Sequence, residues 1–353
     1  MGKLRVGLVG AGYWSMYHLN AWSKVEDAEL YALCDRSEEK LQTKAKEYFI
    51  PDELLFRSID DMLKSDEIDI VDIVTGPDSH VELVTKAAKA KKAILCQKPF
   101  ASSMDEIMQM VNAAEEAGVP LMVTENWRYN APFQVAKKVL DEGIVGDIIG
   151  GRYFHANNFS LNMVDRSRMI QPYFKDMKRL LFYELGTHLY DTSVYLFGMP
   201  KRVTAVFNRI SPHVIGDDNG TVILGYDDYN VTIDASWATR RAFSPAANET
   251  DQNIQDESVY IDGTKGSLLL EHMGNGRPDN AIVAFVDTNG KRRILSDDVQ
   301  YNRWDAIQMV TQNFVNGMLK KDSFATDGKF CASVMNILFK AYESSETGKT
   351  VEI

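Results

Sequence analysis

One apolar stretch in the middle of the chain, "LLFYELGTHLYD" at residues 180–191, carries groups that can do proton chemistry. Its apolar spacing predicts a helix, in which Glu184, His188 and Asp191 follow one another at steps of four and three residues. These steps put the three side chains on one helical face, where a carboxylate one turn away can fix the tautomer of the imidazole. Gly186 lowers helix stability by about 1 kcal/mol relative to alanine, which indicates the close approach of another group.

Two other interpretations of this stretch compete with a catalytic one. A helix histidine that hydrogen-bonds a neighbouring carboxylate is a common structural arrangement and needs no substrate. The same residues resemble a set of metal ligands, but no HExxH-like spacing supplies further donors, so we predict no metal site. The choice between a catalytic and a structural histidine depends on what the rest of the chain places opposite it.

The composition is that of a globular protein long enough for two domains. The chain has 353 residues, 45% of them hydrophobic and 25% charged. Its net charge of −11 argues against nucleic acid or an anionic membrane as a partner and favours a small molecule, because a phosphate surface would be repelled. The three cysteines show no CxxC spacing, and the N-terminus has no signal-peptide pattern or membrane span, so we expect a cytoplasmic protein.

Short β-branched runs alternate with helical patterns from residue 4 to residue 124. The runs include "LRVGLV", "IDIVDIV" and "AILC", and helical segments such as "SEEKLQTKAKEY" separate them. This alternation is typical of a parallel sheet that is wound by helices on both faces. We therefore predict an α/β domain of the Rossmann type over residues 1–124.

The first of these runs leads into a dinucleotide-binding fingerprint. Gly10 and Gly12 allow a tight turn and the close approach of a pyrophosphate. Tyr13 and Trp14 then lead into the following helix, and Ser15 replaces the third glycine of the pattern. A lone glycine-rich loop is weak evidence, but this one follows a strand, opens a helix and precedes an acidic residue by about 20 positions. The loop is therefore predicted to bind a dinucleotide.

The acidic residue of the fingerprint is Asp35, at the end of the second predicted strand. In this position a carboxylate accepts hydrogen bonds from adenine-ribose hydroxyls and repels a 2′-phosphate, which favours NAD over NADP. Arg36 complicates this preference, because its guanidinium can either stack on adenine or pair with a 2′-phosphate. For both residues the structural alternative is a solvated turn before the next helix.

Three segments, in order along the chain, resemble the Gfo/Idh/MocA oxidoreductase family. "GAGYW" resembles its nucleotide loop, "QKP" at 97–99 its Glu-Lys-Pro motif, and "ELGTHLYD" its Asp-x-Gly-x-His-x-x-Asp helix. The similarity continues through "TGPDSH" at 75–80, "IDGTKGSLLL" at 261–270 and the tail "KAYESSETGKTVEI". Two residues depart from the family pattern. Gln97 stands where the family usually has glutamate, and its amide can still hydrogen-bond a ribose. Glu184 stands where many members have aspartate, and it keeps the carboxylate.

This resemblance implies an NAD-dependent dehydrogenase that oxidises a secondary alcohol of a sugar, sugar acid or cyclitol. Lys98 would lie at the carboxyl edge of the first sheet, where such sheets bind ligands, and would meet His188 across the cleft that holds the nicotinamide. His188 would take the hydroxyl proton, and Lys98 would stabilise the alkoxide and relay the proton. Glu184 or Asp191 would orient the imidazole. Besides the loop residues, the implied cofactor site includes Thr75, His80, Gln97 and Lys98.

The remainder of the chain, residues 125–353, resembles the family's second domain, which has an open-faced, mostly antiparallel sheet and carries the substrate. The predicted fold class is thus α/β followed by α+β. Tight turns at "GYDDYN", "DGTKG" and "DTNG" support hairpins. Family members cover the open face by association, so we expect a homodimer or homotetramer. Side chains that suit a polyhydroxylated ligand, each with a structural role as the alternative, are Arg128, Tyr129, His155, Lys175 and Trp237.

Two other functions are compatible with this resemblance. Some relatives keep NAD bound and use transient oxidation to assist glycoside cleavage, and other proteins of this fold are catalytically silent nucleotide sensors. Lys98, His188 and the carboxylate at Glu184 argue against a silent sensor. The sequence does not separate a dehydrogenase from an NAD-assisted glycosidase.

Overall fold

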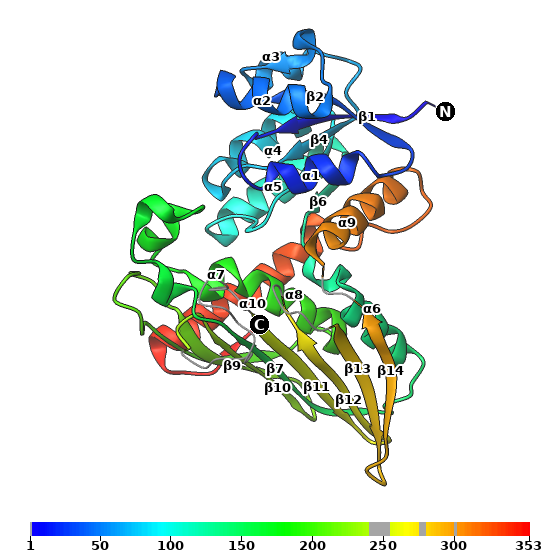
Figure 1. Cartoon of the computed structure of the whole chain (residues 1–353), viewed down its shortest axis with the longest axis vertical. Coiled ribbons are helices and arrows are strands. Elements are labelled where there is room, and N and C mark those ends of the chain that lie inside the picture. The colour runs from blue at the N-terminus through cyan, green and yellow to red at the C-terminus, as the bar shows by residue number, and fades with distance from the viewer. Residues whose placement is uncertain (1, 240–254, 275–279, 300–301) are drawn as a thin grey trace. The chain divides into compact units, whose positions relative to one another are not determined.

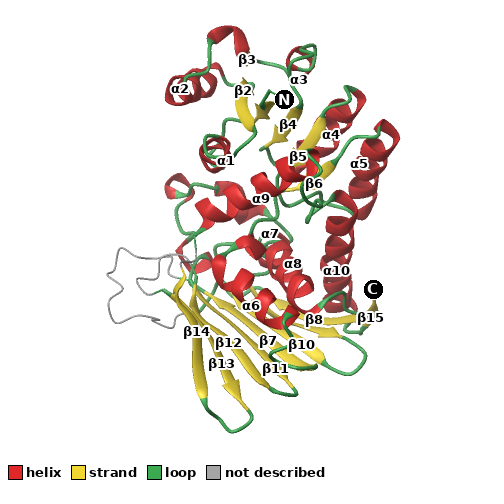
Figure 2. Ribbon diagram, turned by 90° about the vertical axis from the view of Figure 1, so that its right-hand side faces the viewer, coloured by secondary structure: helices red, strands yellow, loops and turns green. Residues whose placement is uncertain are grey.

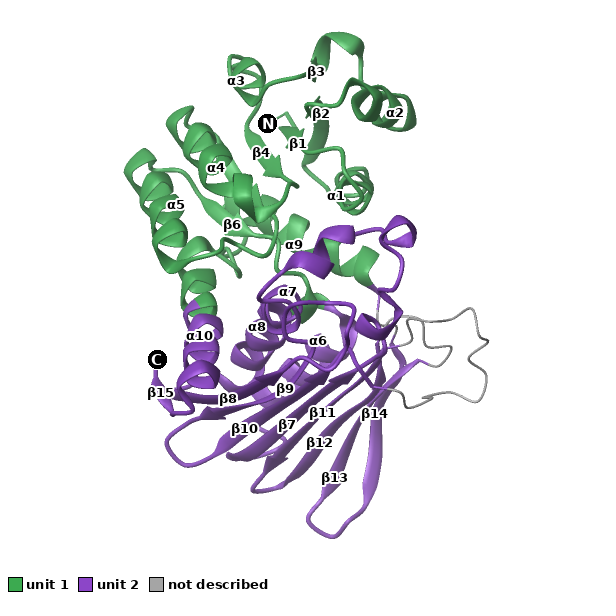
Figure 3. Cartoon of the chain, turned by 90° about the vertical axis from the view of Figure 1, so that its left-hand side faces the viewer, with its two compact units in different colours: residues 1–129, 303–335 green, residues 130–302, 336–353 purple. Residues whose placement is uncertain are grey.

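The computed structural model describes residues 2–239, 255–274, 280–299 and 302–353. The chain divides into two compact units, which Figure 3 distinguishes by colour. Unit 1 comprises Met1–Tyr129 and Arg303–Met335, and unit 2 comprises Asn130–Asn302 and Asn336–Ile353. The predicted contiguous division into residues 1–124 and 125–353 did not anticipate that part of the C-terminal region belongs to unit 1.

Unit 1 is built on a six-stranded sheet with the strand order β3-β2-β1-β4-β5-β6 (Figure 1). All neighbouring strands are parallel. Every residue of β4 and β5 is buried, as expected where helices cover both faces of a parallel sheet. The predicted Rossmann fold is confirmed. Its strands are β1 (Leu4–Val9), β2 (Ala28–Cys34), β3 (Leu55–Phe56), β4 (Ile70–Ile73), β5 (Ala93–Cys96) and β6 (Leu121–Val123).

The helices of unit 1 begin and end at local sequence signals. Ser37 and Ser103 cap α2 and α5, since their side chains accept hydrogen bonds from main-chain N–H groups of the first turn. Gly118 ends α5 in the left-handed conformation. The helices are α1 (Ser15–Trp22), α2 (Glu38–Tyr48), α3 (Ile59–Met62), α4 (His80–Lys89), α5 (Met104–Ala117) and α9 (Arg303–Met318).

Residues 303–335 belong to unit 1 because they complete its core. The Val123 N–H of β6 donates to the Thr326 carbonyl oxygen at 2.9 Å, and the Thr326 hydroxyl donates to the Val123 carbonyl oxygen at 2.7 Å. α9 packs on α1, where the rings of Tyr17 and Trp304 have centroids 4.2 Å apart. Phe314 of α9 is fully buried in the same hydrophobic cluster as β1. These contacts join residues that are distant in sequence.

Unit 2 is built on a nine-stranded sheet with the order β14-β13-β12-β11-β7-β10-β9-β8-β15 (Figure 2). Its neighbouring strands are antiparallel, except that β7 and β10 are parallel. The strands are β7 (Ile148–Ala156), β8 (Arg202–Asn208), β9 (Asn219–Gly225), β10 (Asn230–Ser236), β11 (Asp256–Gly263), β12 (Gly266–Met273), β13 (Ala281–Asp287), β14 (Arg292–Val299) and β15 (Val351–Glu352).

Helices cover one face of this sheet and leave the other face open (Figure 2). On the covered face, Phe133 of α6 packs against Tyr153 of β7 with ring centroids 6.2 Å apart. On the opposite face, Val206 and Ile223 are 60% and 41% exposed. The predicted open-faced, mostly antiparallel sheet is confirmed. The helices are α6 (Ala131–Asp141), α7 (Leu181–Glu184) and α8 (Gly186–Phe197), and α10 (Gly328–Thr347) is divided between the two units.

Candidate active site

The glycine loop after β1 is tightly packed at one glycine and open at the other. Gly10 has a φ of +105°, and a Cβ there would lie 2.4 Å from the Val74 carbonyl oxygen, so no other residue fits. A Cβ at Gly12 would have no heavy atom within 4 Å. The buried Ser15 hydroxyl donates to the Gly12 carbonyl oxygen at 2.7 Å and closes the turn. The open position at Gly12 gives a ligand room to approach the main chain.

Backbone donors are available beside this open position. Within the described ranges of the chain, the amide N–H groups of Gly12, Tyr13 and Trp14 have no hydrogen-bond acceptor. They lie at the N-terminus of α1, whose first turn contains no acidic side chain. Unsatisfied N–H groups and the helix dipole together attract an anion such as a pyrophosphate.

Asp35 holds the glycine loop through its carboxylate. Its Oδ2 accepts a hydrogen bond from the Ala11 N–H at 2.7 Å, and its Oδ1 accepts one from the Ser37 N–H at 2.8 Å. A carboxylate has about four acceptor positions, so each oxygen retains one for a ribose hydroxyl. The contact with Ala11 is a role that the sequence analysis did not assign.

Two arginines border Asp35. Arg36 is exposed on the turn that follows β2. Arg57, which the sequence analysis missed, donates to the Arg36 carbonyl oxygen and pairs with Glu38 at 3.2 Å. Arg57 follows β3, the strand beside β2, so its proximity depends on a two-residue strand that sequence pattern does not reveal. Its pairing with Glu38 offsets part of the positive charge that it brings near Asp35.

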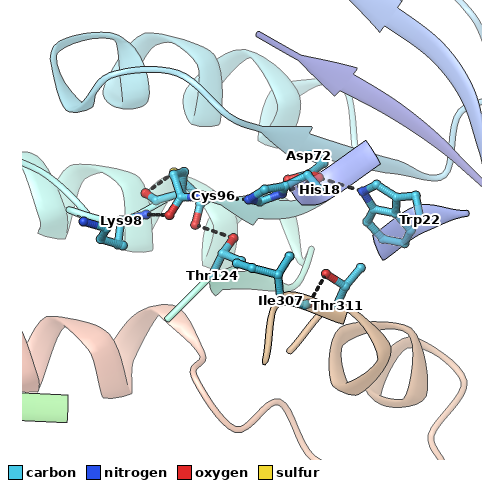
Figure 4. A network of polar contacts seen from close by, with 9 residues as sticks. His18, Trp22, Asp72, Cys96, Lys98, Thr124, Ile307 and Thr311 are labelled. Atoms are coloured by element: carbon cyan, nitrogen blue, oxygen red, sulfur yellow. Dashed lines mark hydrogen bonds and ion pairs between the residues drawn. The ribbon is translucent and has the colours of Figure 1, made fainter. Parts of the chain in front are cut away.

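Lys98 follows β5 at the carboxyl edge of the sheet, and the side chain of Gln97 bonds its main chain (Figure 4). The Lys98 N–H donates to Gln97 Oε1 at 2.7 Å, and Gln97 Nε2 lies 2.8 Å from His18 Nε2. His18 Nδ1 in turn lies 2.8 Å from Asp72 Oδ2. Both polar atoms of the Gln97 amide thus have partners inside unit 1, and its contact with a ribose stays a prediction.

His80 holds the chain on the other side of Lys98. Its imidazole is fully buried at the start of α4, with Nδ1 3.0 Å from the Phe100 carbonyl oxygen and Nε2 3.1 Å from the Thr75 carbonyl oxygen. Burial lowers the pKa of His80, against the opposing effect of these carbonyl groups. His80 therefore links the Thr75 loop to the segment after Lys98. The predicted roles of Thr75 and His80 in cofactor binding stay predictions.

Arg128 and Tyr129 lie in unit 1, in a short 3-10 helix after β6. Arg128 is 5% exposed; its Nη1 donates to the Ala325 carbonyl oxygen at 3.3 Å, and its guanidinium carbon lies 4.6 Å from the centre of the Phe330 ring. Tyr129 belongs to the hydrophobic core of the unit. Both residues thus anchor the returning C-terminal segment, and their contact with substrate stays a prediction.

In unit 2, the stretch expected to be one helix contains two. α7 ends at Glu184 and α8 begins at Gly186, and the His188 N–H donates to the Leu185 carbonyl oxygen at 2.9 Å. This three-residue step tightens the turn where glycine weakens the helix. A Cβ at Gly186 would lie 3.2 Å from the ring of Tyr190, which is fully buried. Gly186 therefore makes room for that ring.

The three titratable residues of this stretch are buried. Glu184, His188 and Asp191 are 8%, 4% and 1% exposed, and each of them has interaction partners. Tyr173, which the sequence analysis missed, lies in the segment before α7. Burial and the negative charge of Glu184 raise the pKa of Tyr173. Nothing in the local sequence around Tyr173 signals this proximity.

His155 lies on the covered face of the sheet in unit 2. It is fully buried in β7, and its Nδ1 lies 3.8 Å from Oε2 of Glu257, a buried residue of the neighbouring strand β11. The Tyr153 hydroxyl donates to the other oxygen of Glu257. His155 is therefore part of a buried polar group between two strands, and its predicted contact with substrate is not tested by these distances.

Lys175 and Trp237 support a loop of unit 2. Lys175 Nζ donates to the carbonyl oxygens of Met163 and Val164 at 2.7 and 3.0 Å. Trp237 is 5% exposed and stacks on Phe174 with a centroid distance of 5.9 Å. Lys175 and Trp237 thus both have a structural role in this loop. Their predicted contact with substrate stays a prediction.

Among the residues that the structure describes, no cluster of three or more His, Cys, Asp or Glu is placed to hold a metal ion. In the same part of the chain, no helix combines the length and the apolar character needed to cross a membrane.

Two family models match the chain. One, described as an oxidoreductase family with an NAD-binding Rossmann fold, matches residues 4–125, and the GFO/IDH/MocA C-terminal domain matches residues 133–269. The chain is 30% identical over 356 residues to a D-apiose dehydrogenase of Paraburkholderia graminis, covering 99% of this chain and 90% of that protein. It is 27% identical over 361 residues to a myo-inositol 2-dehydrogenase of Thermotoga maritima, covering 99% and 98% of the two chains.

A solved structure is similar over the same extent. An oxidoreductase of Agrobacterium radiobacter, crystallised with NAD+, L-tartaric acid and magnesium, has a TM-score of 0.87 at 28% identity and covers 99% of this chain and 98% of its own. The fold and the glycine loop thus define an oxidoreductase with an NAD-binding Rossmann domain. The chain belongs to the Gfo/Idh/MocA family, which confirms the resemblance seen in the sequence.

The residues around the glycine loop fit NAD by their own chemistry. Gly12 leaves space at the main chain, the amide donors at the start of α1 suit a pyrophosphate, and the Asp35 carboxylate suits a ribose diol.

Replacement of Gly12 by alanine is expected to weaken NAD binding without destabilising the fold. The methyl group would enter the open space and keep the pyrophosphate from the main chain, so the Kd for NAD should rise at least about tenfold. The free energy of unfolding without NAD should change by less than about 0.5 kcal/mol, as is usual for an open site. Calorimetric titration and chemical denaturation measure the two quantities.

Gly10→Ala is the matched control. Its methyl group would meet the Val74 carbonyl oxygen at a positive φ, so this variant should lose more than about 1 kcal/mol of stability. If Gly12→Ala binds NAD as tightly as the unaltered protein does, the pyrophosphate does not approach this position.

Proposed function

We propose that this protein is an NAD-dependent dehydrogenase that oxidises a secondary alcohol of a sugar, sugar acid or cyclitol. The proposal rests on the combination of three features in one chain. The glycine loop is open, Lys98 lies at the carboxyl edge of a parallel sheet, and a buried His188 lies on the same helical stretch as the Glu184 and Asp191 carboxylates. The relatives named for D-apiose and myo-inositol support a polyhydroxylated substrate, because a sugar and a cyclitol both carry several hydroxyl groups.

The glycine loop and Asp35 would hold NAD, which would supply the hydride acceptor for the oxidation. His188 takes the proton of the hydroxyl group, since imidazole is the side chain best suited to accept a proton near neutral pH. Lys98 stabilises the negative charge that develops on the oxygen and relays the proton. Glu184, or alternatively Asp191, orients the imidazole ring. A positioned general base contributes about 10² to 10⁴ in rate.

A spectrophotometric screen for NADH formation tests the proposed reaction. The substrates are D-apiose, other aldoses, aldonic acids, myo-inositol and related cyclitols, together with glycosides of the common aldoses, with NADP in parallel. At least one polyol should give one NADH for each molecule oxidised. Cleavage of a glycoside without net NADH would favour the NAD-assisted glycosidase instead, and bound NAD without any reduction or cleavage would contradict both enzymes.

His188→Asn is expected to separate chemistry from cofactor binding. Asparagine keeps a polar side chain but cannot act as the base, so kcat should fall about 10²-fold or more while the Kd for NAD changes little. Lys98→Met should also lower kcat. If the two residues serve one proton relay, the double variant should lose much less than the product of the two single losses.

The measurements are kcat and the Kd for NAD of the two single variants and the double variant, with the substrate found in the screen. A wild-type kcat for His188→Asn would mean that His188 is a structural residue of α8. If the reduction of kcat in the double variant equals the product of the two single reductions, Lys98 and His188 act in independent steps.

NAD is proposed to bind more tightly than NADP because of Asp35. Asp35→Asn keeps an oxygen acceptor for the Ala11 N–H and removes the charge, so the ratio of the NADP Kd to the NAD Kd should fall at least about tenfold. Asp66→Asn, at an exposed position before β4, is the control and should leave the ratio unchanged. Equal Kd values of the unaltered protein for both nucleotides would contradict the proposal.

The open face of the sheet in unit 2 is proposed to bind the same face of a second copy, giving a homodimer or homotetramer. Val206 and Ile223 are more than two-fifths exposed on this face, at 60% and 41%. Ile223→Lys should shift the mass measured by light scattering at micromolar concentration towards the monomer. Thr43→Lys on α2 is the control and should not. A monomeric unaltered protein would contradict this interface.

A further inference from the structure

Three polar side chains from different elements meet in the core of unit 1, close to the main chain of Lys98 (Figure 4). His18 lies in α1, Asp72 in β4 and Gln97 directly after β5. They are 0%, 0% and 5% exposed. Their contacts are 2.8 Å between Gln97 Nε2 and His18 Nε2, and 2.8 Å between His18 Nδ1 and Asp72 Oδ2. The proposed function does not use this network.

The direction of every hydrogen bond in the network follows from one main-chain group. The Lys98 N–H can only donate, so Gln97 Oε1 is the acceptor at 2.7 Å and Gln97 Nε2 is the donor. His18 Nε2 must then carry a lone pair, and the ring proton must be on Nδ1, where it is donated to Asp72. Asp72 Oδ2 also accepts the Trp22 indole N–H at 2.7 Å. His18 is therefore neutral and in the Nδ1–H tautomer.

We propose that His18 and Gln97 are positioning residues that hold the main chain of Lys98 in a fixed relation to α1, the helix opened by the glycine loop. The network starts at a carboxylate in the central strand β4, passes through α1 and ends on the Lys98 N–H. His80 holds Phe100 beyond Lys98, so the lysine lies between two buried anchors. The functional part of this proposal rests on the proposed role of Lys98.

Glutamine at position 97, where the family usually has glutamate, is part of the same inference. A neutral His18 in the Nδ1–H tautomer needs a donor at Nε2, and the glutamine amide is one, whereas a carboxylate is not. A glutamate here would place a second carboxylate on the imidazole, opposite Asp72, and would favour the imidazolium form that donates from both nitrogens. The donors and acceptors of Gln97, His18 and Asp72 thus match one another, and the carboxylate of the network is that of Asp72.

The tautomer can be measured without any substrate. In protein labelled with ¹⁵N-histidine, the His18 resonances, identified by their loss in His18→Asn, should show a protonated Nδ1 and an unprotonated Nε2 at pH 7. In Gln97→Glu both nitrogens should be protonated. Gln109→Glu, at an exposed position of α5, is the control and should leave the His18 spectrum unchanged. A protonated Nε2 in the unaltered protein would overturn the assigned direction of the network.

A double-variant cycle tests positioning through Lys98. Gln97→Met removes both hydrogen bonds, so kcat should fall about tenfold or more in the unaltered chain but less than about twofold in the Lys98→Met background. A residue that merely supports the fold would lower kcat by the same factor in both backgrounds, and this result would overturn the positioning role.

Two further outcomes keep the test decisive. If Gln97→Met does not fold, Gln97→Leu takes its place in the cycle with the same expectation, because leucine also has no acceptor for the Lys98 N–H and no donor for His18. If Lys98→Met alone has an unaltered kcat, the proposed role of Lys98 fails and the positioning role falls with it, while the histidine spectrum still decides the direction of the hydrogen bonds.

Discussion

Buried polar groups at the carboxyl edge of the first sheet must find partners inside the protein, and this requirement fixes the main chain around Lys98. A buried donor or acceptor without a partner costs about 1–3 kcal/mol. Gln97 meets the requirement through His18 and the Lys98 N–H, and His80, whose pKa is lowered by burial, has one ring N–H to donate to the carbonyl oxygen of Thr75 or of Phe100. The segment that carries Lys98 is therefore held from two sides by groups that have few alternative arrangements.

The same requirement shapes the second unit. Asp217 accepts hydrogen bonds from the main-chain N–H groups of Leu180 and Phe182, both at 2.9 Å, and from the Tyr342 hydroxyl at 2.8 Å. Burial raises the pKa of Asp217 against the opposing effect of these three bonds. A buried acid thus fixes the start of α7, and α7 ends at Glu184. In both units the proposed catalytic groups are supported by polar residues that do not themselves belong to the reaction.

The sequence predicts local features of this molecule well and distant pairings poorly. The glycine loop, the parallel sheet and the hairpins follow from neighbouring residues, whose period and turn chemistry are visible in the chain. The contact of Gln97 with His18 joins residues that are 79 positions apart, and Arg57, which contacts Arg36, directly follows a strand of two residues. No spacing rule links such pairs, because the fold and not the local pattern brings them together.

Gln97 shows why a departure from a motif is best judged together with the residues that contact it. Compared with the family pattern alone, Gln97 is a loss of charge next to a proposed catalytic lysine. In the structure its amide donates to a histidine whose other nitrogen faces a carboxylate, so the negative charge of the network is located at Asp72 and is shared between the His18 and Trp22 donors. The position next to Lys98 then supplies a hydrogen-bond acceptor and no net charge. A substitution that is unfavourable in isolation is in this way compatible with a core in which both polar atoms of the Gln97 amide have partners.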